Sequence, residues 1–263
     1  MANNKTTKTD QPTNRHATPE DHPAPAETNA KSQQVASDEA RSSESEVADF
    51  LSKMESFSPK TKAGNGRLIF AMDATMSRQP TWDMALSLQS EMFAAVRDVG
   101  GLHVQLMYFR GFGECRASKW VSEPMALQRL MTQISCQGGH TQIGKVLSHA
   151  RKQAEQGRVD AVVFVGDAME ERVDDLCMRA GELGLLGVPV FVFQEGYDVN
   201  VERAFKEIAR LTKGAWCRFD SGSAAQLREL LTAVAVFAAG GRKALEQLAH
   251  KKGAQLLLEQ LNR

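Results

Sequence analysis

Three oxygen-bearing side chains stand at alternate positions in the first third of the chain: Asp73, Thr75 and Ser77. A carboxylate and two hydroxyls are hard oxygen donors, and a site with one formal charge and few protein ligands suits Mg²⁺, which keeps several of its waters. The motif contains no His or Cys, the usual ligands of zinc. The same residue types are also common after a strand because they cap the next helix. The motif alone therefore leaves a metal site and a helix cap as alternatives.

The residues around this motif predict how it is held. An apolar run over residues 68–72 comes directly before Asp73, and a helical pattern begins at Thr81. This order is typical of a buried strand that leads into a helix, with Asp73 at the carboxyl end of the strand. Ligands of open α/β sheets bind at that end. We expect the Asp73 side chain to face solvent there.

Strand-like and helix-like segments alternate after Gly66, which is the sequence form of a doubly wound sheet. The turn at residues 110–113 contains two glycines and joins two strands as a hairpin, so one edge strand is antiparallel. The predicted fold class is α/β: a doubly wound, mostly parallel sheet with one antiparallel edge strand and helices on both faces. Strands are expected over residues 67–72, 102–109, 114–121, 159–165, 188–193 and 215–219, and helices over residues 81–99, 124–134, 141–156, 173–186, 199–211 and 224–239.

Both ends of the chain differ from this folded part. Residues 1–58 are rich in polar residues and have no aromatic residue before Phe50, so we expect a disordered tail. Apolar residues at helical spacing predict a short amphipathic helix near residues 46–56, which either docks on its own domain or binds a partner. We expect the folded domain over residues 59–240. A break at Gly240 and Gly241 then introduces a C-terminal amphipathic helix over residues 241–263.

The overall composition argues against several classes of partner and binding site. The chain has 32 basic and 32 acidic residues, so no bulk charge favours nucleic acid or an anionic membrane surface. Its four cysteines are far apart and form no Cys-x-x-Cys pair, which argues against a zinc site and against a secreted disulfide framework. The first residues lack the apolar region of a signal peptide, and no apolar run is long enough to span a membrane. We expect a cytoplasmic chain without nucleic-acid or membrane partners.

Two later segments carry further oxygen donors. Residues 138–144 read GGHTQIG and open a predicted helix with Thr141, and Asp167 follows a Val-rich predicted strand. Together with the motif around Asp73, these segments resemble the three parts of the metal-ion-dependent adhesion site of von Willebrand factor A domains. The resemblance covers about residues 66–239. It implies the doubly wound sheet with an antiparallel edge strand that the pattern of segments predicts.

In this family the corresponding positions bind a metal ion. The resemblance implies Mg²⁺ as the cofactor, with Mn²⁺ and Ca²⁺ as alternatives, and it implies no catalytic residue. Two positions depart from the family's pattern: Thr75 stands where Ser is usual, and Ala168 follows the third acid where Gly is usual. The site is accordingly either an intact metal site or a vestigial one held by hydrogen bonds. The implied metal ligands are Asp73, Thr75, Ser77, Thr141 and Asp167.

The function implied by the resemblance is recognition without catalysis. A hard cation held by carboxylates and neutral hydroxyls keeps an open position, which an Asp or Glu of a partner protein fills. The resemblance thus implies an intracellular, metal-dependent protein-interaction module. Bacterial stand-alone members of the family often work with AAA+ ATPases or chaperone-like machinery, so an assembly factor with such a partner is expected.

A metal-dependent phosphatase or hydrolase on a similar sheet is the alternative function. Asp73 would then be the nucleophile, as in phosphatases of the haloacid dehalogenase type. Those enzymes usually have a second Asp where this chain has Thr75, so the general acid is missing. The sequence also contains neither of the Gly-rich loops that bind nucleotide phosphates.

Residues next to the three segments are candidates for tuning partner binding. Arg78 and Trp82 follow the first motif and would anchor a partner if exposed, although Trp82 is equally suited to pack inside. An acidic run follows the third segment and is interpreted as a solvated helix N-terminus that the helix dipole favours. It consists of Glu170, Glu171, Asp174 and Asp175.

Overall fold

The computed structural model of this chain describes residues 49, 65–95, 101–219 and 224–252. The predicted disordered tail over residues 1–58, with its amphipathic helix near residues 46–56, lies outside the described residues apart from Asp49. The last part of the predicted C-terminal helix, residues 253–263, lies outside them as well.

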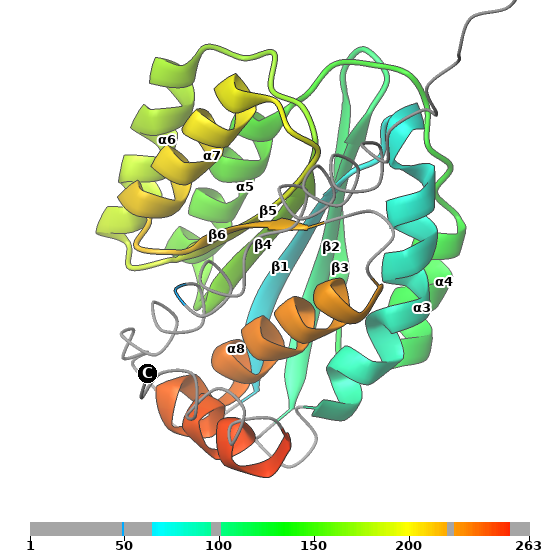
Figure 1. Ribbon diagram of the computed structural model, residues 1–263, viewed down its shortest axis with the longest axis vertical. Helices are drawn as coiled ribbons and strands as arrows, with labels where there is room; N and C mark the ends of the chain where they lie inside the picture. The colour runs from blue at the N-terminus through cyan, green and yellow to red at the C-terminus, as the bar shows by residue number, and fades with distance from the viewer. Residues whose placement is uncertain (1–48, 50–64, 96–100, 220–223, 253–263) are drawn as a thin grey trace, which may run out of the picture.

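A six-stranded sheet forms the centre of the fold (Figure 1). Its strands are β1 (Gly66–Asp73), β2 (Leu102–Arg110), β3 (Glu114–Val121), β4 (Ala161–Gly166), β5 (Val190–Glu195) and β6 (Trp216–Phe219). They lie in the order β3-β2-β1-β4-β5-β6, and neighbouring strands are parallel except β2 and β3, which form an antiparallel hairpin. The predicted α/β fold with one antiparallel edge strand is confirmed.

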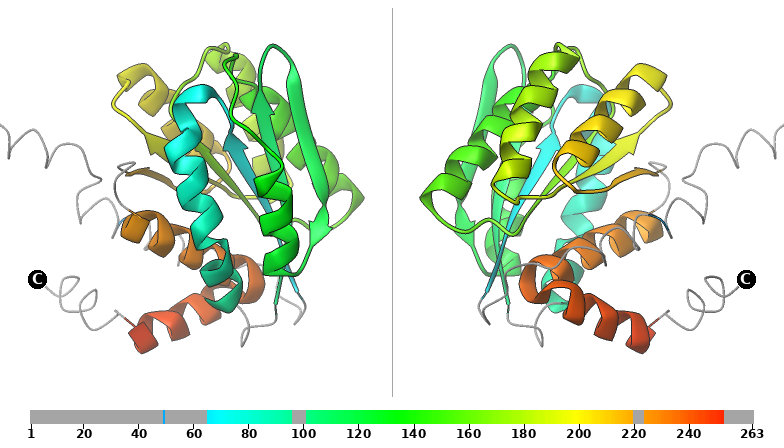
Figure 2. Two further views of the ribbon diagram at one scale, coloured as in Figure 1. Left: turned by 90° about the vertical axis from the view of Figure 1, so that its right-hand side faces the viewer. Right: turned by 90° about the vertical axis from the view of Figure 1, so that its left-hand side faces the viewer.

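Helices cover both faces of the sheet (Figures 1 and 2). One face carries α3 (Gln79–Ala95), α4 (Pro124–Thr132) and α8 (Ala224–Lys252), and the other carries α5 (Ile143–Gln156), α6 (Val173–Leu185) and α7 (Val199–Leu211). The side chains of β1 alternate between these layers, with Phe70 and Met72 in the first and Ile69 and Ala71 in the second. Burial on both faces explains the uninterrupted apolar run before Asp73.

The strand order decides which chain segments meet at the carboxyl end of the sheet. β1 and β4 are adjacent and parallel, with Met72 opposite Val165. The strand order reverses between them, and ligands of doubly wound sheets bind at this point. A 3₁₀ turn, η1 (Met76–Arg78), follows β1 and leads into α3. The last residue of β1 and the residues after β4 therefore lie next to each other.

Gly241 interrupts α8 with a φ of 70° and a ψ of −164°, which are not helical values. A positive φ of this size suits glycine because it has no Cβ. The interruption lies at the break predicted at Gly240 and Gly241, and helical backbone continues after it to Lys252. Within the described residues, no helix combines the length and the apolar character that a bilayer crossing requires.

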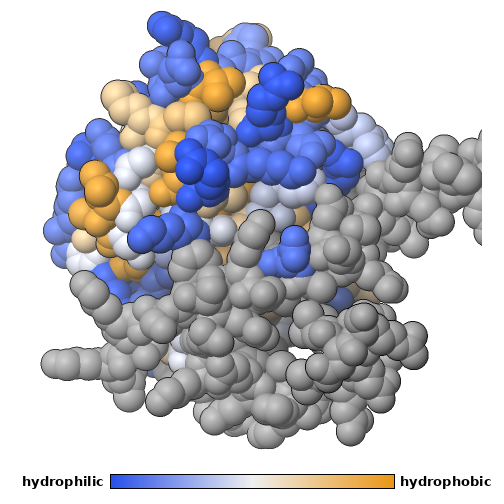
Figure 3. Space-filling view, turned by 60° about the vertical axis from the view of Figure 1, so that its left-hand side comes forward, coloured by the Kyte–Doolittle hydropathy of each residue, from blue (hydrophilic) through white to orange (hydrophobic). Residues whose placement is uncertain are grey.

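The outer surface near α6 and α7 is mainly hydrophilic, with small hydrophobic patches (Figure 3). The most exposed large apolar side chains of α6 are Met178 and Leu185, 59% and 91% exposed. Single apolar side chains on a polar surface are common in soluble domains. The exposed apolar side chains of α6 are therefore an ordinary feature of this surface.

Candidate metal centre

The five predicted ligands meet at the carboxyl ends of β1 and β4. Asp73 is the last residue of β1, Asp167 directly follows β4, and the loop between α4 and α5 contributes Thr141. All five line one hollow of about 260 Å³, whose other lining residues are Met76, Gly138, Gly139, Ala168 and Glu170. The structure thus brings together every residue that the sequence predicts as a ligand.

Asp73 is buried, with 1% of its surface exposed, so the expectation that it faces solvent is wrong. Its Oδ1 accepts a hydrogen bond of 2.7 Å from the Thr75 amide, while its Oδ2 is buried without a hydrogen-bond partner among the described residues. Burial raises the pKa of Asp73 to about 6, the Thr75 amide opposes this shift, and the charge of Asp167 adds to it. A charged oxygen in this state is costly unless a cation or a proton reaches it.

Asp167 is a second carboxylate with one hydrogen-bonded and one unpartnered oxygen among the described residues. Ser77 Oγ donates to its Oδ2 at 3.1 Å, and Thr75 Oγ1 lies 3.3 Å from Ser77 Oγ. Its Oδ1 is buried and lacks a hydrogen-bond partner within the part of the chain that the structure describes. Two carboxylates thus each keep one unpartnered oxygen beside two hydroxyls. An oxygen-only donor set of this kind fits Mg²⁺.

Carboxylates alone do not complete the ligand set. Among residues 65–95, 101–219 and 224–252, no group of three or more His, Cys, Asp or Glu side chains is placed to hold a metal ion. An ion in the hollow would therefore need the hydroxyl ligands Thr75, Ser77 and Thr141 as well as the two acids. Neutral ligands of this type also keep the charge of the ion from being fully compensated.

Thr141 is held by two hydrogen bonds with Glu170. Its amide donates to Glu170 Oε2 at 2.9 Å, and its Oγ1 accepts from the Glu170 amide at 2.9 Å. The Thr141 amide is the main cause that lowers the pKa of Glu170. His140, whose side chain is 64% exposed, places Nδ1 3.0 Å from the same Glu170 oxygen. The loop after β4 thus fixes the Thr141 hydroxyl beside the hollow.

Backbone contacts pin the loop between α4 and α5 to the sheet. The Gln137 amide donates to the Ala74 carbonyl at 2.9 Å, and the His140 amide donates to the Gly111 carbonyl at 3.1 Å. Gly139 packs directly against the Gly111 backbone. A Cβ at position 139 would lie only 2.2 Å from the Gly111 oxygen. This close approach of two backbones requires glycine at position 139.

The first backbone amides of α5 find their hydrogen-bond acceptor outside the helix. Its N-cap residue, Gln142, makes no side-chain cap. Instead the carboxylate of Glu171 accepts from the amides of Ile143 and Gly144, both at 2.7 Å. A negative charge at this place also suits the dipole of α5. A residue from the third segment therefore caps the helix that follows the second.

The acidic run consequently has two roles. Asp174 and Asp175 lie in the first turn of α6, in agreement with the prediction. Glu170 and Glu171 bind the backbone of the loop before α5 and of α5 itself, so the prediction is wrong for these two. No local sequence signal could have found them, because their partners lie 27 and 29 residues away.

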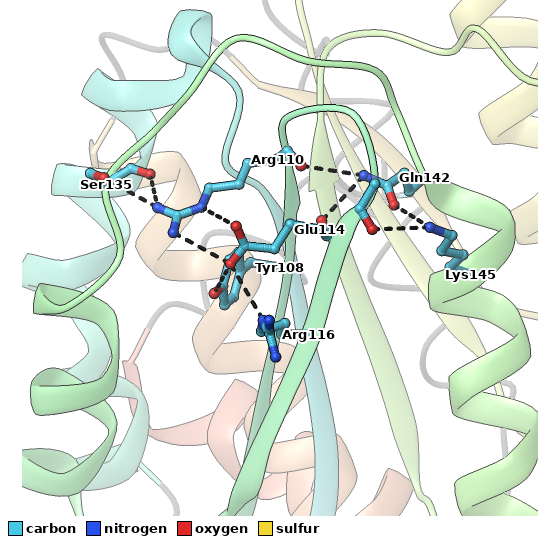
Figure 4. Close-up of polar contacts among 8 residues, drawn as sticks. Tyr108, Arg110, Glu114, Arg116, Ser135, Gln142 and Lys145 are labelled. Atoms are coloured by element: carbon cyan, nitrogen blue, oxygen red, sulfur yellow. Dashed lines mark hydrogen bonds and ion pairs between the residues drawn. The ribbon is translucent and has the colours of Figure 1, made fainter.

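A second polar cluster, the hairpin network of Tyr108, Arg110, Glu114, Ser135 and Gln142, lies beside this loop (Figure 4). Tyr108 Oη donates to Glu114 Oε1 at 2.6 Å, and Arg110 Nε donates to Glu114 Oε2 at 3.0 Å. These bonds lower the pKa of Glu114, and that from Arg110 has the larger effect. Arg110 Nη1 also donates to the Ser135 carbonyl at 2.5 Å. The hairpin is thereby tied to the start of the α4–α5 loop.

The hairpin network also reaches the end of that loop. Gln142 Nε2 donates to the carbonyls of Arg110 and Glu114, at 3.4 Å and 3.2 Å (Figure 4). Lys145 Nζ donates to Gln142 Oε1 at 2.7 Å and orients this amide. Because Gln142 directly follows Thr141, the network fixes both ends of the segment that carries the predicted hydroxyl ligand.

Arg78 and Trp82, considered as anchors at the rim, are both buried. Trp82 Nε1 donates to the Met131 carbonyl at 3.2 Å inside the core. Arg78 places Nη2 2.9 Å from Asp167 Oδ2, and its Nη1 pairs with Glu195 at the end of β5. Glu195 has no sequence signal that marks it as functional, because one acid at a strand end has no distinctive local pattern.

The large apolar side chains exposed beside the hollow are Met76 and Phe112, 64% and 88% exposed. Met76 lines the hollow itself. Phe112 lies in the turn between β2 and β3, and the centre of its ring is 5.3 Å from that of His140 in an edge-on arrangement. Met76 and Phe112 thus expose apolar surface beside the polar hollow.

Comparisons with known proteins point to one fold. The sequence matches no protein-family model and no curated protein at a significant level. The structure is similar to a von Willebrand factor type A protein from Catenulispora acidiphila, with 15% identity and a TM-score of 0.53 over 66% of this chain and 43% of that one. It is also similar to the SpRpn10 VWA domain, with 12% identity and a TM-score of 0.50 over 67% and 98% of the two chains.

A third similar structure is proximal thread matrix protein 1 from the mussel byssus, with 17% identity and a TM-score of 0.51. It is matched over 67% of this chain and 47% of its own length. This chain therefore spans less than half of the byssus and Catenulispora structures. At these identities the similarity concerns the fold, and the fold of this chain is that of the von Willebrand factor A domain.

Proposed function

We propose that this chain is a protein-interaction module that holds a divalent cation, Mg²⁺ in the first place, and offers it to a carboxylate of a partner protein. Asp73, Thr75, Ser77, Thr141 and Asp167 would be the ligands. The observation that carries the proposal is the pair of carboxylates, Asp73 and Asp167, each with one buried oxygen that lacks a hydrogen-bond partner among the described residues. In the bound state the ion would supply an open coordination position for an Asp or Glu of the partner.

The residues of this chain have distinct tasks in such a module. The two acids supply the negative charge, and the hydroxyls complete the ligand set without adding charge. Glu170 and Glu171 hold the α4–α5 loop in place through its amides. Phe112 and Met76 would pack against apolar side chains of the partner beside its carboxylate.

The class of partner is also part of the proposal. The resemblance to von Willebrand factor A domains supports an AAA+ ATPase or a chaperone-like machine in the cytoplasm as the partner. This partner would present an exposed Asp or Glu, since that side chain completes the coordination of a hard cation. An ion held by hydroxyls would then act as the bridge between the two proteins.

Titration of the full chain with Mg²⁺ by calorimetry tests the metal site. Wild type is compared with Thr141→Ala and with a matched control, Thr132→Ala, whose exposed hydroxyl only donates to the Arg129 carbonyl in α4. We expect binding by wild type and the control and none by Thr141→Ala. Equal binding by all three would place the ion elsewhere. Absence of binding by all three would favour a vestigial site.

Partner capture gives the second test. Wild type immobilised with Mg²⁺ should retain a protein that is released by a chelator and that Thr141→Ala does not retain. The phosphatase alternative makes a different prediction, namely hydrolysis of p-nitrophenyl phosphate that is lost on Asp73→Asn. Such turnover would overturn the interaction module.

A further inference from the structure

Arg78 places a positive charge at the acidic end of the sheet, that is, the carboxyl ends of β4 and β5 where Asp167 and Glu195 lie. Its side chain is 9% exposed and bridges carboxylates from two strands. Nη2 lies 2.9 Å from Asp167 Oδ2 after β4, and Nη1 pairs with Glu195 at the end of β5. Thr81 Oγ1 also donates to Glu195. These contacts hold the Arg78 guanidinium between the two acids.

This bridge uses only one oxygen of Asp167. Oδ2 accepts from Ser77 and pairs with Arg78, whereas Oδ1 has no hydrogen-bond partner within the described ranges. Arg78 therefore leaves free the oxygen that an ion needs. A cation bound through Oδ1 would share this carboxylate with a fixed positive charge.

We propose that Arg78 is a built-in counter-cation of the metal centre, which stabilises the acidic end of the sheet without an ion and weakens the affinity for one. The inference rests on the metal binding proposed above. The ion is not needed for folding, because Arg78 supplies the positive charge that the Asp167 and Glu195 carboxylates require. The ion binds weakly by itself, because it shares Asp167 with a like charge. A carboxylate from the partner then adds the missing negative charge.

The main test compares the Mg²⁺ affinity of the full-length wild type with that of Arg78→Gln by calorimetry. Removal of a unit charge next to a divalent ion should tighten binding roughly tenfold or more, even with strong solvent screening. The matched control is Arg116→Gln, which removes an arginine that is 74% exposed and pairs with Glu114 at 3.6 Å. This control should bind Mg²⁺ like the wild type.

Thermal unfolding supplies an independent readout. Arg78→Gln leaves Glu195 without its cation, so its Tm in excess chelator should fall by about 5–10 °C, and Mg²⁺ should restore much of the loss. The Tm of wild type should change little on chelation. If Arg78→Gln does not fold, the double variant Arg78→Gln with Glu195→Gln also removes the carboxylate charge that Arg78 pairs at the end of β5, and it should fold and keep the tighter binding.

The outcomes separate this inference from the proposed function. Tighter binding by either variant supports the inference, even if wild type alone binds too weakly to measure. Binding by wild type with equal or weaker binding by the folded variants overturns the inference and leaves the metal site standing. Absence of binding by wild type and by both folded variants overturns the two together.

Discussion

Asp73 and Glu114 are carboxylates at the same end of the sheet, and their surroundings shift their pKa in opposite directions. Both oxygens of Glu114 accept hydrogen bonds, from Tyr108 and Arg110, and its pKa is lowered. One oxygen of Asp73 is buried without a hydrogen-bond partner among the described residues, and burial raises its pKa to about 6. A carboxylate with all its partners supports the structure, whereas the unpartnered oxygen of Asp73 is the basis of the proposed cation site.

The two regions also depend on each other. The hairpin network around Glu114 holds both ends of the α4–α5 loop, and the middle of that loop lines the hollow around Asp73. Residues whose polar groups have hydrogen-bond partners thus surround a site in which two carboxylate oxygens have none among the described residues. Such support is needed because a metal centre requires its ligands in fixed positions before the ion arrives.

The largest effect is expected where the two regions touch. Gly139→Ala places a Cβ against the Gly111 backbone, whereas a Cβ at Gly138 meets nothing within 4 Å. We expect Gly139→Ala to lower the free energy of unfolding by about 3 kcal/mol, near the upper end for overpacking, and to abolish Mg²⁺ binding. Denaturant unfolding and calorimetry would measure both, with Gly138→Ala as the control. Equal stability of the two variants would mean that the loop is free to move away.

Neutralising the two carboxylates should have opposite consequences for stability. In excess chelator at pH 7, Asp73→Asn should raise the free energy of unfolding by about 2–3 kcal/mol, because it removes a buried charge whose pKa is raised to about 6. Glu114→Gln should lower it, because it weakens the bonds from Arg110 and Tyr108. Mg²⁺ binding should be lost in the first variant and kept in the second. A loss of stability in Asp73→Asn would instead make Asp73 a structural residue.

The pH dependence should follow from the raised pKa of Asp73. Between about pH 4 and pH 6 the folded metal-free chain binds a proton that the unfolded chain does not, so this group lowers stability as the pH rises through that window. Above pH 6 its unfavourable contribution is constant. The same proton competes with the ion, so Mg²⁺ affinity should fall up to tenfold per pH unit below about 6. Calorimetry from pH 5 to pH 8 would measure this, and an unchanged affinity would contradict the assignment of Asp73 as a ligand.

The smallest effects are expected at Thr75. Thr75→Ser keeps the hydroxyl and restores the residue usual in the family, so Mg²⁺ affinity should stay within about threefold and stability within about 0.5 kcal/mol. Thr75→Val keeps the shape but removes an oxygen ligand, so its affinity should fall by about tenfold or more at similar stability. Calorimetry and thermal unfolding of the pair would measure the contribution of the hydroxyl alone. Equal affinities would exclude Thr75 as a ligand.

Local sequence patterns predicted most of the fold. β3 and α7 have the predicted bounds, Glu114–Val121 and Val199–Leu211, because glycine, proline and polar residues mark their ends clearly. α5 starts at Ile143, two residues later than predicted, since Thr141 bonds to Glu170 outside the helix. Tertiary hydrogen bonds therefore moved a boundary that the local pattern could not place.

The sequence by itself determined the order of strands and helices along the chain, the β2–β3 hairpin and the set of candidate ligands near strand ends. These follow from hydrophobic periodicity and from motifs within a few residues. Only the tertiary structure decided that Asp73 is buried, that Glu171 caps α5, and that Arg78 bridges Asp167 and Glu195. The physical reason is that burial and charge pairing depend on which strand ends become neighbours. The Thr81–Glu195 contact, for example, joins residues 114 positions apart, and no local pattern specifies such a pair.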